Sequence, residues 1–284
     1  MFTQLLFSWN IIRPQKGYFS FYIQVRDAQT QKWGNWYLMA DWGCGVQKTY
    51  LSNSDGISSF VHVRLELESK KYADAFCIKV ESHDSADIGL VHALSGALSN
   101  FSLFDVENNN FNDLKTIMIT GIPAIAQFSV DHEDKGRICS PASCAMFVQY
   151  ITRKPLDMNS FITAVFDEGL SVYGSWQCNI AHMFDVCDGK MNFCFLRANT
   201  FIDIYRYLEQ KVPVVVSVRG TLPGALKAFP HGHLMMVIGW DSEKKEVVCH
   251  DPAAESNNMV LKRYPIEPFL RAWERSHRLM YVAH

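Results

Sequence analysis

The feature that most constrains the fold of this 284-residue chain is a change of hydrophobic period along it. In residues 18–27 apolar side chains such as Phe19, Phe21 and Ile23 alternate with others, which is typical of a half-buried strand. Later, in residues 161–166, the apolar side chains recur at helical spacing. The sequence therefore predicts a strand-rich part followed by a part that begins with helices.

Residues 1–112 are predicted to form an all-β domain. Strand-like runs, "NWYLMADWG", "SSFVHVRLELES" and "DAFCIKVESH", follow one another at short spacing, with polar turn-like clusters between them. Several short strands at this spacing predict a sandwich or a jelly-roll-like fold. Its tryptophans are expected to pack the core or cover an edge, and the alternative is a sugar-binding surface. These tryptophans are Trp9, Trp33, Trp36 and Trp42.

Residues 113–284 are predicted to form a separate α+β domain, and the polar, Asn-rich segment 104–116 is the predicted linker. Helices are predicted from "SPASCAMFVQYI", "DMNSFITAVFDEG" and "TFIDIYRYLEQ". Strands are predicted at 212–218, 233–240 and 246–251, and the polar residues between the last two predict a hairpin. Helices first and a hairpin-rich sheet after them make an α+β pattern.

The composition argues against several classes of function. The formal net charge is −2 and no Lys/Arg cluster stands out, so we expect neither nucleic acid nor an anionic membrane as a partner. The apolar runs are too short to span a bilayer, and no signal peptide is visible. Eight cysteines without a CxxC motif or zinc-ligand spacing indicate reduced thiols. We therefore expect a protein that is cytoplasmic, or exported without a visible signal peptide.

The stretch "GRICSPASCAMFVQYI" contains two cysteines, Cys139 and Cys144. Cysteine is commonly buried, so both could be packing residues. Cys139 lies where the helix is predicted to begin, with Pro141 in the first turn, and the free N–H groups there stabilise a thiolate. Cys144 lies more than a turn inside, among apolar residues, where burial raises the pKa of a thiol. Cys139 is therefore the predicted reactive cysteine, and Cys144 a core residue.

A thiolate nucleophile usually needs an imidazole partner, which in turn needs an acceptor to orient it. His233 opens one strand of the predicted hairpin and Asp251 ends the other, so the hairpin makes these two residues adjacent. Of the competing histidines, His250 points to the opposite face from Asp251, and His231 lies in a loop that faces solvent or the cleft. We therefore expect Cys139, His233 and Asp251 to form a triad.

An oxyanion at the nucleophile needs a donor besides the backbone N–H of Cys139. Gln127, twelve residues upstream in "GIPAIAQFSV", could supply its side-chain amide, although from spacing alone an ordinary loop position fits equally well. The segment "SVDHEDKGRI", just before Cys139, is acidic. We expect a solvated loop there, and the alternative is a loop that gates the cleft or favours basic substrates.

Residues from roughly 120 to the end of the chain resemble the bacterial C39-like cysteine peptidases of the papain-like group. The resemblance rests on an ordered set of segments: "PAIAQ", "CSPAS", "YGSWQCN", "VPVVVSVRG", "GHLMMVIGWD", "VVCHDPAAESNNMV" and "FLRAWERS". It implies a papain-like fold, in which the helix bearing the cysteine packs on an antiparallel sheet. The first part of the chain also looks like the β domain that precedes such peptidase domains in some bacterial proteins.

The same resemblance implies a role for each of four residues. Cys139 is the nucleophile, His233 the general base, Asp251 the orienting acid and Gln127 the oxyanion donor. It implies no cofactor and no metal. The implied partner is a peptide or protein substrate.

Three hypotheses for function follow. The first is a cysteine peptidase that cleaves peptide or amide bonds through a thioester acyl-enzyme. The second is an acyl transferase or amidase with the same triad. The third is a non-catalytic protein whose β domain binds a glycan or a protein. Because all four catalytic positions are filled, the sequence favours an enzyme.

Overall fold

The computed structural model describes residues 1–104 and 111–284, and the chain forms two compact units. Unit 1 consists of Met1–Phe104 and Val165–Cys194, and unit 2 of Asp105–Ala164 and Phe195–His284. The chain therefore enters each unit twice. Part of the predicted linker, residues 105–110, lies outside the described residues. The division into a β domain at 1–112 and a peptidase domain at 113–284 stays a prediction.

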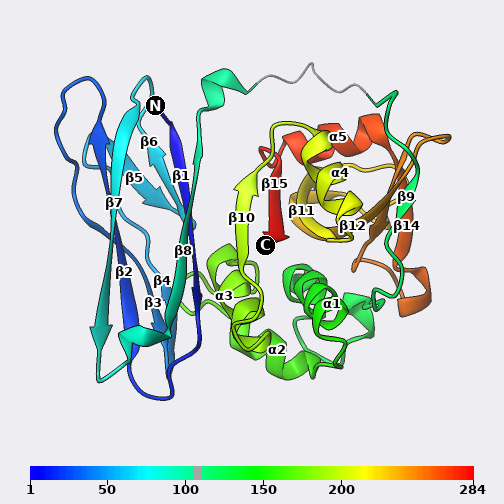
Figure 1. The fold of residues 1–284 in the computed structure, drawn as a ribbon, viewed down its shortest axis with the longest axis horizontal. Helices are drawn as coiled ribbons and strands as arrows, with labels where there is room; N and C mark the ends of the chain where they lie inside the picture. The colour runs from blue at the N-terminus through cyan, green and yellow to red at the C-terminus, as the bar shows by residue number, and fades with distance from the viewer. Residues whose placement is uncertain (105–110) are drawn as a thin grey trace. The chain divides into compact units, whose positions relative to one another are not determined.

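Unit 1 is built on two four-stranded antiparallel sheets, in the orders β5-β6-β1-β8 and β4-β3-β2-β7 (Figure 1). Their inner faces share one apolar core, to which β2 contributes Phe19, Phe21, Ile23 and Val25, all fully buried. The alternation in this strand is therefore confirmed. The strands are β1 (Gln4–Ile11), β2 (Tyr18–Asp27), β3 (Tyr37–Gly43), β4 (Val46–Thr49), β5 (Ser58–Val61), β6 (Arg64–Leu67), β7 (Ala73–His83) and β8 (Val91–Ser99).

The tryptophans of unit 1 divide into two pairs. Trp9 and Trp42 are fully buried, and the Trp9 ring stacks on Phe21 with 4.1 Å between the ring centroids. The expectation of core packing is confirmed for this pair. Trp33 and Trp36 are each 42% exposed and do not belong to this core, so for them the covering of an edge stays a prediction.

The segment 165–194 belongs to unit 1 although it lies far along the chain. Its helix α3 (Trp176–Val186) packs on β1, all of whose residues are buried. Buried polar contacts fix this packing. The Gln177 side-chain amide donates to the Phe7 carbonyl oxygen (3.0 Å), and the Asn10 side chain exchanges two hydrogen bonds with the backbone of Phe193 (2.9 and 2.8 Å).

A close approach of two backbones holds the start of this segment. The Asp167 carboxylate accepts from the backbone N–H of Thr49 (2.9 Å). A Cβ atom at Gly169 would lie 1.9 Å from the Thr49 carbonyl oxygen, so a side chain there would displace the backbone of β4. Glycine at this position is therefore a packing requirement.

Unit 2 is built around a seven-stranded sheet in the order β10-β15-β11-β12-β13-β14, with β9 paired to β12. The pairings recorded within it are antiparallel. The strands are β9 (Ile117–Met118), β10 (Phe193–Arg197), β11 (Val214–Gly220), β12 (Phe229–Asp241), β13 (Glu246–His250), β14 (Leu261–Pro265) and β15 (Leu279–Ala283). The helices are α1 (Cys139–Thr152), α2 (Met158–Val165), α4 (Phe201–Glu209) and α5 (Ile266–Glu274).

The predicted helices and strands of this part are confirmed, and with them the α+β class. Helix α4 begins where the sequence predicts, because Thr200 and Asp203 form a capping box. Short 3-10 helices occur at Ile88–Leu90, Phe101–Leu103, Gln127–Ser129, Lys135–Arg137 and Asn257–Met259. In the described ranges no helix combines the length and apolar character needed to cross a membrane.

Helix α1 and strand β12 form the part of unit 2 that positions the site. Nine consecutive residues of α1, Ser140–Val148, are buried, as expected for a helix packed against a sheet. The Ser143 hydroxyl donates to the Leu234 carbonyl oxygen on β12 (3.1 Å). This bond fixes the first turns of α1 beside the start of β12.

Candidate active site

Cys139 is the first residue of α1, and no side chain caps this end of the helix. The residue before it, Ile138, is the N-cap, so the first backbone N–H groups remain available to other acceptors. The N–H groups of Ser140 and Leu234 both donate to the Cys139 sulfur. The helix start therefore provides the thiolate-stabilising surroundings that the sequence predicts.

His233 and Asp251 are brought together by the hairpin of β12 and β13. The strands pair from Asp241 opposite Glu246 to Met236 opposite His250, so the open end of the hairpin lies at His233 and Asp251. The His233 Nε2 atom lies 2.7 Å from Asp251 Oδ1, and both side chains are buried. The His233 ring also hydrogen-bonds with the Cys139 thiol, and this bond lowers the pKa of the thiol and raises that of the ring.

The titration of these groups is set by their mutual contacts. Burial raises the pKa of the Cys139 thiol, but the hydrogen bond and charge of His233 and two backbone N–H groups outweigh it, so the pKa is lowered. Burial lowers the pKa of His233, whereas Asp251 and Cys139 raise it more strongly, to about 9. These opposite shifts favour a thiolate beside an imidazolium.

Asp251 has two further hydrogen-bond donors. The backbone N–H of Ala253 donates to Oδ1 (2.8 Å), and the Tyr264 hydroxyl donates to Oδ2 (2.6 Å). Burial raises the pKa of the Asp251 carboxyl, but His233, Tyr264 and Ala253 together lower it below the usual range. Asp251 is therefore held as an anion in a fixed orientation toward His233.

Two aromatic residues at the site are absent from the sequence-based prediction. Tyr264, on β14, is fully buried against Asp251. Phe229, the first residue of β12, stacks on the His233 ring with 4.0 Å between centroids and 12° between planes. The pairing of β14 with β13 brings Tyr264 to the site, and no local motif signals that pairing.

Gln127 lies beside the same cleft and is buried. Its backbone N–H donates to the Pro252 carbonyl oxygen (2.8 Å), which ties it to the residue after Asp251. Its side-chain nitrogen donates to the Lys135 carbonyl oxygen (2.9 Å), and the described residues offer no acceptor for the second hydrogen of that nitrogen. Gln127 therefore retains one N–H that can donate a hydrogen bond to an oxygen atom of a bound molecule.

The other cysteines and histidines near the site have different surroundings. Cys144 is fully buried, and burial raises the pKa of its thiol well above the ordinary value. The His250 ring meets the Pro123 carbonyl oxygen (3.2 Å), and burial lowers the pKa of this ring. His231 is exposed at the edge of the cleft. The structure thus brings Cys139, His233, Asp251 and Gln127 together and leaves the competing residues outside this cluster.

The cleft beside Cys139 and His233 has a volume of about 560 Å³. One wall consists of residues between Gln127 and Cys139, and the other of residues 227–233, which are the end of the loop before β12 and the first five residues of that strand, so His231 lies in the strand and not in a loop. Gly232 lines the cleft with φ +98°, a conformation that favours glycine, and a Cβ atom there would meet nothing within 4 Å. A glycine here leaves the approach to His233 open.

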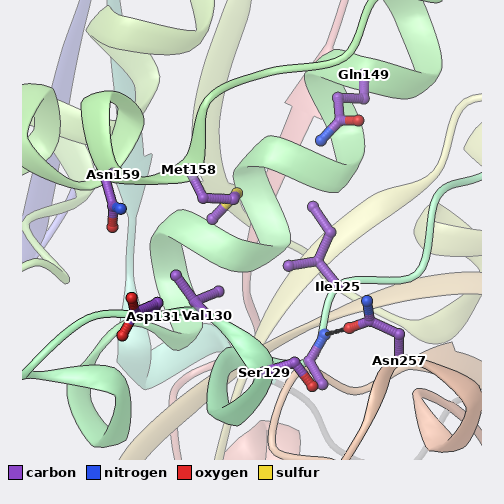
Figure 2. Close-up of a pocket in the computed structure, with 9 residues that line it drawn as sticks. Ile125, Ser129, Val130, Asp131, Gln149, Met158, Asn159 and Asn257 are labelled. Atoms are coloured by element: carbon purple, nitrogen blue, oxygen red, sulfur yellow. Dashed lines mark hydrogen bonds between the residues drawn. The ribbon is translucent and has the colours of Figure 1, made fainter.

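A second hollow of about 310 Å³ lies on unit 2 (Figure 2). Polar side chains surround it, including Asp131, Gln149 and Asn159. The Asn257 side chain at its edge accepts from the backbone N–H of Ala126 (2.8 Å), the residue next to Gln127. Asp131 belongs to the acidic segment before Cys139, and it lines this hollow, not the cleft.

Metal ligation finds no support in the part of the chain that the structure describes. There, no group of three or more His, Cys, Asp or Glu side chains has an arrangement that could hold a metal ion.

Comparison with known proteins gives the family of the chain. The model of the Peptidase_C39 like family matches residues 119–281, more than half of the chain. A structure described as a C39-like peptidase from Bacillus anthracis aligns with 60% of this chain and 98% of its own, at 15% identity and a TM-score of 0.46. Xylellain, a cysteine protease from Xylella fastidiosa, aligns with 59% of this chain and 85% of its own, at 12% identity and a TM-score of 0.36. No curated protein matches.

The family match spans α1, the β12–β13 hairpin and β14, which are the elements that carry the cluster. The chain therefore belongs to the Peptidase_C39 like family, and it is a cysteine-type peptidase.

Proposed function

We propose that the protein hydrolyses peptide or amide bonds with Cys139 as nucleophile, His233 as general base and acid, and Asp251 as the residue that orients His233. The observation that carries the proposal is the hydrogen-bonded series from Cys139 through His233 to Asp251 at the wall of an open cleft. A helix that bears the cysteine and packs on an antiparallel sheet fits a papain-like arrangement. The expected substrate is a peptide or a protein.

The first half of the reaction forms a thioester. The Cys139 thiolate attacks the carbonyl carbon, and the carbonyl oxygen takes the negative charge. The Gln127 side-chain N–H and the Cys139 backbone N–H stabilise this oxyanion. The His233 imidazolium then protonates the leaving nitrogen as the C–N bond breaks, which leaves the acyl group on the Cys139 sulfur.

The second half of the reaction restores the enzyme. A water molecule attacks the thioester carbonyl carbon while His233 takes its proton. The C–S bond breaks and the Cys139 sulfur leaves as a thiolate beside the reprotonated imidazole. Asp251 stays ionised throughout, because three donors hold its carboxylate.

The proposal is tested by labelling with a thiol-directed acylating probe. Cys139→Ala is expected to abolish both labelling and peptide cleavage, whereas Cys144→Ala keeps both. Equal labelling of the two variants would contradict the assignment of Cys139. Product analysis with and without an added amine acceptor separates hydrolysis from acyl transfer, since transfer gives a new amide and hydrolysis gives an acid.

A glycan or protein ligand of the β domain stays a prediction. Trp33 and Trp36 are exposed, but cations lie near both rings: the Arg26 guanidinium is 5.8 Å from the Trp33 centroid and the Lys79 ammonium 5.5 Å from that of Trp36. Binding of the whole protein to a glycan array, compared with binding of its Trp36→Ala variant, tests this prediction.

A further inference from the structure

The charged residues that line the cleft are of one sign. Arg137 and Lys227 both line it, together with the exposed His231. No Asp or Glu is among the described residues that line this cleft. This lining contrasts with the chain as a whole, whose formal net charge is −2. The positive lining is therefore a local property of the cleft.

The two cations are attached to the same segments as the reacting groups. Arg137 precedes Cys139 by two residues, at the end of the 3-10 helix Lys135–Arg137. Lys227 lies in the loop that leads into β12, six residues before His233. A substrate bond held between Cys139 and His233 therefore places the neighbouring substrate residues beside these cations.

Lys227 lies over an aromatic ring next to Gln127, which lines the opposite wall of the cleft. Its ammonium group lies 5.3 Å from the centroid of the Phe128 ring, and Phe128 follows Gln127. Lys227 is exposed, and in the described ranges no carboxylate lies within ion-pairing distance of it. Its charge is therefore available to a substrate, and it lies close to the oxyanion side of the site.

Arg137 is less available than Lys227. Its guanidinium lies 3.5 Å from the Asp134 carboxylate, so part of its charge is already paired. The Arg137 side chain is 51% exposed and the Asp134 side chain 33%, and an ion pair this accessible to solvent is weak. Lys227 is thus the principal cation of the cleft, and Arg137 adds to it.

The second hollow provides an internal contrast. Asp131 is its charged residue, amide and hydroxyl side chains supply its other polar groups, and no Lys or Arg is among the described residues that line it (Figure 2). The acidic segment before Cys139 thus presents Asp131 to that hollow and Arg137 to the cleft. A preference for basic substrates finds no support in the residues of the cleft.

From this placement we propose that the cleft selects substrates that carry a carboxylate next to the bond to be cleaved, with Lys227 as the specificity residue and Arg137 in support. The inference rests on the proposed function of Cys139 and His233. The carboxylate comes from a Glu or Asp side chain or from a free chain terminus. The substrate carboxylate would form an ion pair with the Lys227 ammonium group on binding, and its negative charge would raise the rate of association with the cleft.

Two pairs of quenched peptides test the inference. The two peptides of the first pair are identical except for one residue next to the cleaved bond, which is Glu in one peptide and Gln in the other. The pair is made once with this residue before the bond and once with it after the bond. The second pair differs by a free or an amidated C-terminus. The wild-type protein is expected to cleave the carboxylate member about two- to fivefold faster in kcat/KM, as an exposed ion pair gives. The pair that shows the difference identifies the source of the carboxylate.

Variants then assign the effect. Lys227→Gln is expected to bring the ratio between the two members close to one, and Lys227→Glu to reverse it, so that the member without the carboxylate is cleaved faster. Arg137→Gln lowers the ratio by a smaller factor. Lys154→Gln, which removes an exposed lysine outside the cleft lining, keeps the wild-type ratio and serves as the matched control. A ratio near one in the wild-type protein, or a ratio unchanged in Lys227→Gln, overturns the inference.

A second measurement does not depend on the peptide chosen. Iodoacetate and iodoacetamide alkylate the same sulfur, but only iodoacetate carries a carboxylate. The ratio of their rates at Cys139 is expected to fall several-fold in Lys227→Gln and to fall at high salt in the wild-type protein. If Cys139 reacts well and the ratio is the same in Lys227→Gln, the proposed function stands and this inference fails. If Cys139 does not react with either reagent, the proposed function itself fails.

Discussion

The first and second turns of helix α1 each carry a cysteine, and the two sulfur atoms have different surroundings. The Cys139 sulfur receives two backbone N–H groups and contacts the His233 ring, whereas Cys144 is fully buried in the apolar face of the helix. The pKa of the first thiol is lowered, and the pKa of the second is raised by burial. Five residues along one helix thus separate the proposed nucleophile from a packing residue, because the groups around a sulfur determine its reactivity.

The largest expected effect comes from removing the group that distinguishes the two sulfurs. His233→Ala takes away the hydrogen bond and charge that lower the pKa of Cys139, so its burial becomes the dominant influence. We expect peptide cleavage to fall by about 10³-fold or more, and alkylation of Cys139 at neutral pH to slow in parallel. His250→Gln, outside the cluster, is the matched control and keeps both rates within about twofold.

The pH dependence extends the same comparison. A lowered pKa of Cys139 means that its thiolate is present below the ordinary thiol range, and a pKa of about 9 for His233 means that the imidazolium persists to about that pH. Peptide cleavage should therefore rise at a pH below the usual thiol pKa and fall near pH 9. In the native protein Cys144 should stay unreactive across this range. A single rise near the ordinary thiol pKa would show that Cys139 is not activated.

Tyr264→Phe should have a smaller effect, because it removes one donor to Asp251 and keeps the ring. The loss of this buried hydrogen bond to a carboxylate is expected to lower the free energy of unfolding by about 1.5–3 kcal/mol and kcat by about three- to tenfold. Asp251, less neutralised, should hold the His233 proton more tightly, so the alkaline limb of the activity profile should move to higher pH.

The control for Tyr264 is Tyr205→Phe, since the Tyr205 hydroxyl donates to the Lys115 carbonyl oxygen (3.1 Å) away from the cluster. It should lower stability and leave the alkaline limb where it is. If both variants have the wild-type pH profile, Tyr264 has only a structural role and does not position Asp251.

Cys144→Ala should have the smallest effect. The change leaves a small cavity in the helix face, so we expect a loss of about 1–2 kcal/mol in the free energy of unfolding, measured by denaturant titration. Peptide cleavage at a temperature where the variant is folded should stay within about twofold. A loss of cleavage comparable to that of Cys139→Ala would end the distinction between the two cysteines.

The geometry around Asp251 shows what the sequence can and cannot provide. The adjacency of His233 and Asp251 depends on one hairpin, and a short polar turn between two strands signals a hairpin locally. The start of α1 at Cys139 likewise depends on residues next to it. Such local relations can be predicted from a single sequence.

Contacts that join distant segments carry no such local signal. Tyr264 reaches Asp251 because β14 pairs with β13, and Lys227 lies over Phe128 because the loop before β12 meets the 3-10 helix Gln127–Ser129. The burial of the polar residues Asn10 and Gln177 in unit 1 likewise depends on segments more than 150 residues apart in the chain. The amino-acid patterns of these positions resemble those of ordinary surface residues, so their partners emerge only in three dimensions.

The way segment 165–194 packs within unit 1 has a consequence for biosynthesis. During translation, all eight strands of the two four-stranded sheets are synthesised well before α3, the helix that covers β1. Until then the outer face of β1 is exposed, with the Asn10 side chain lacking its partner on Phe193. A chain released before Cys194 would therefore keep that face uncovered, and the buried hydrogen bonds that Phe7 and Asn10 make with the later segment would not form.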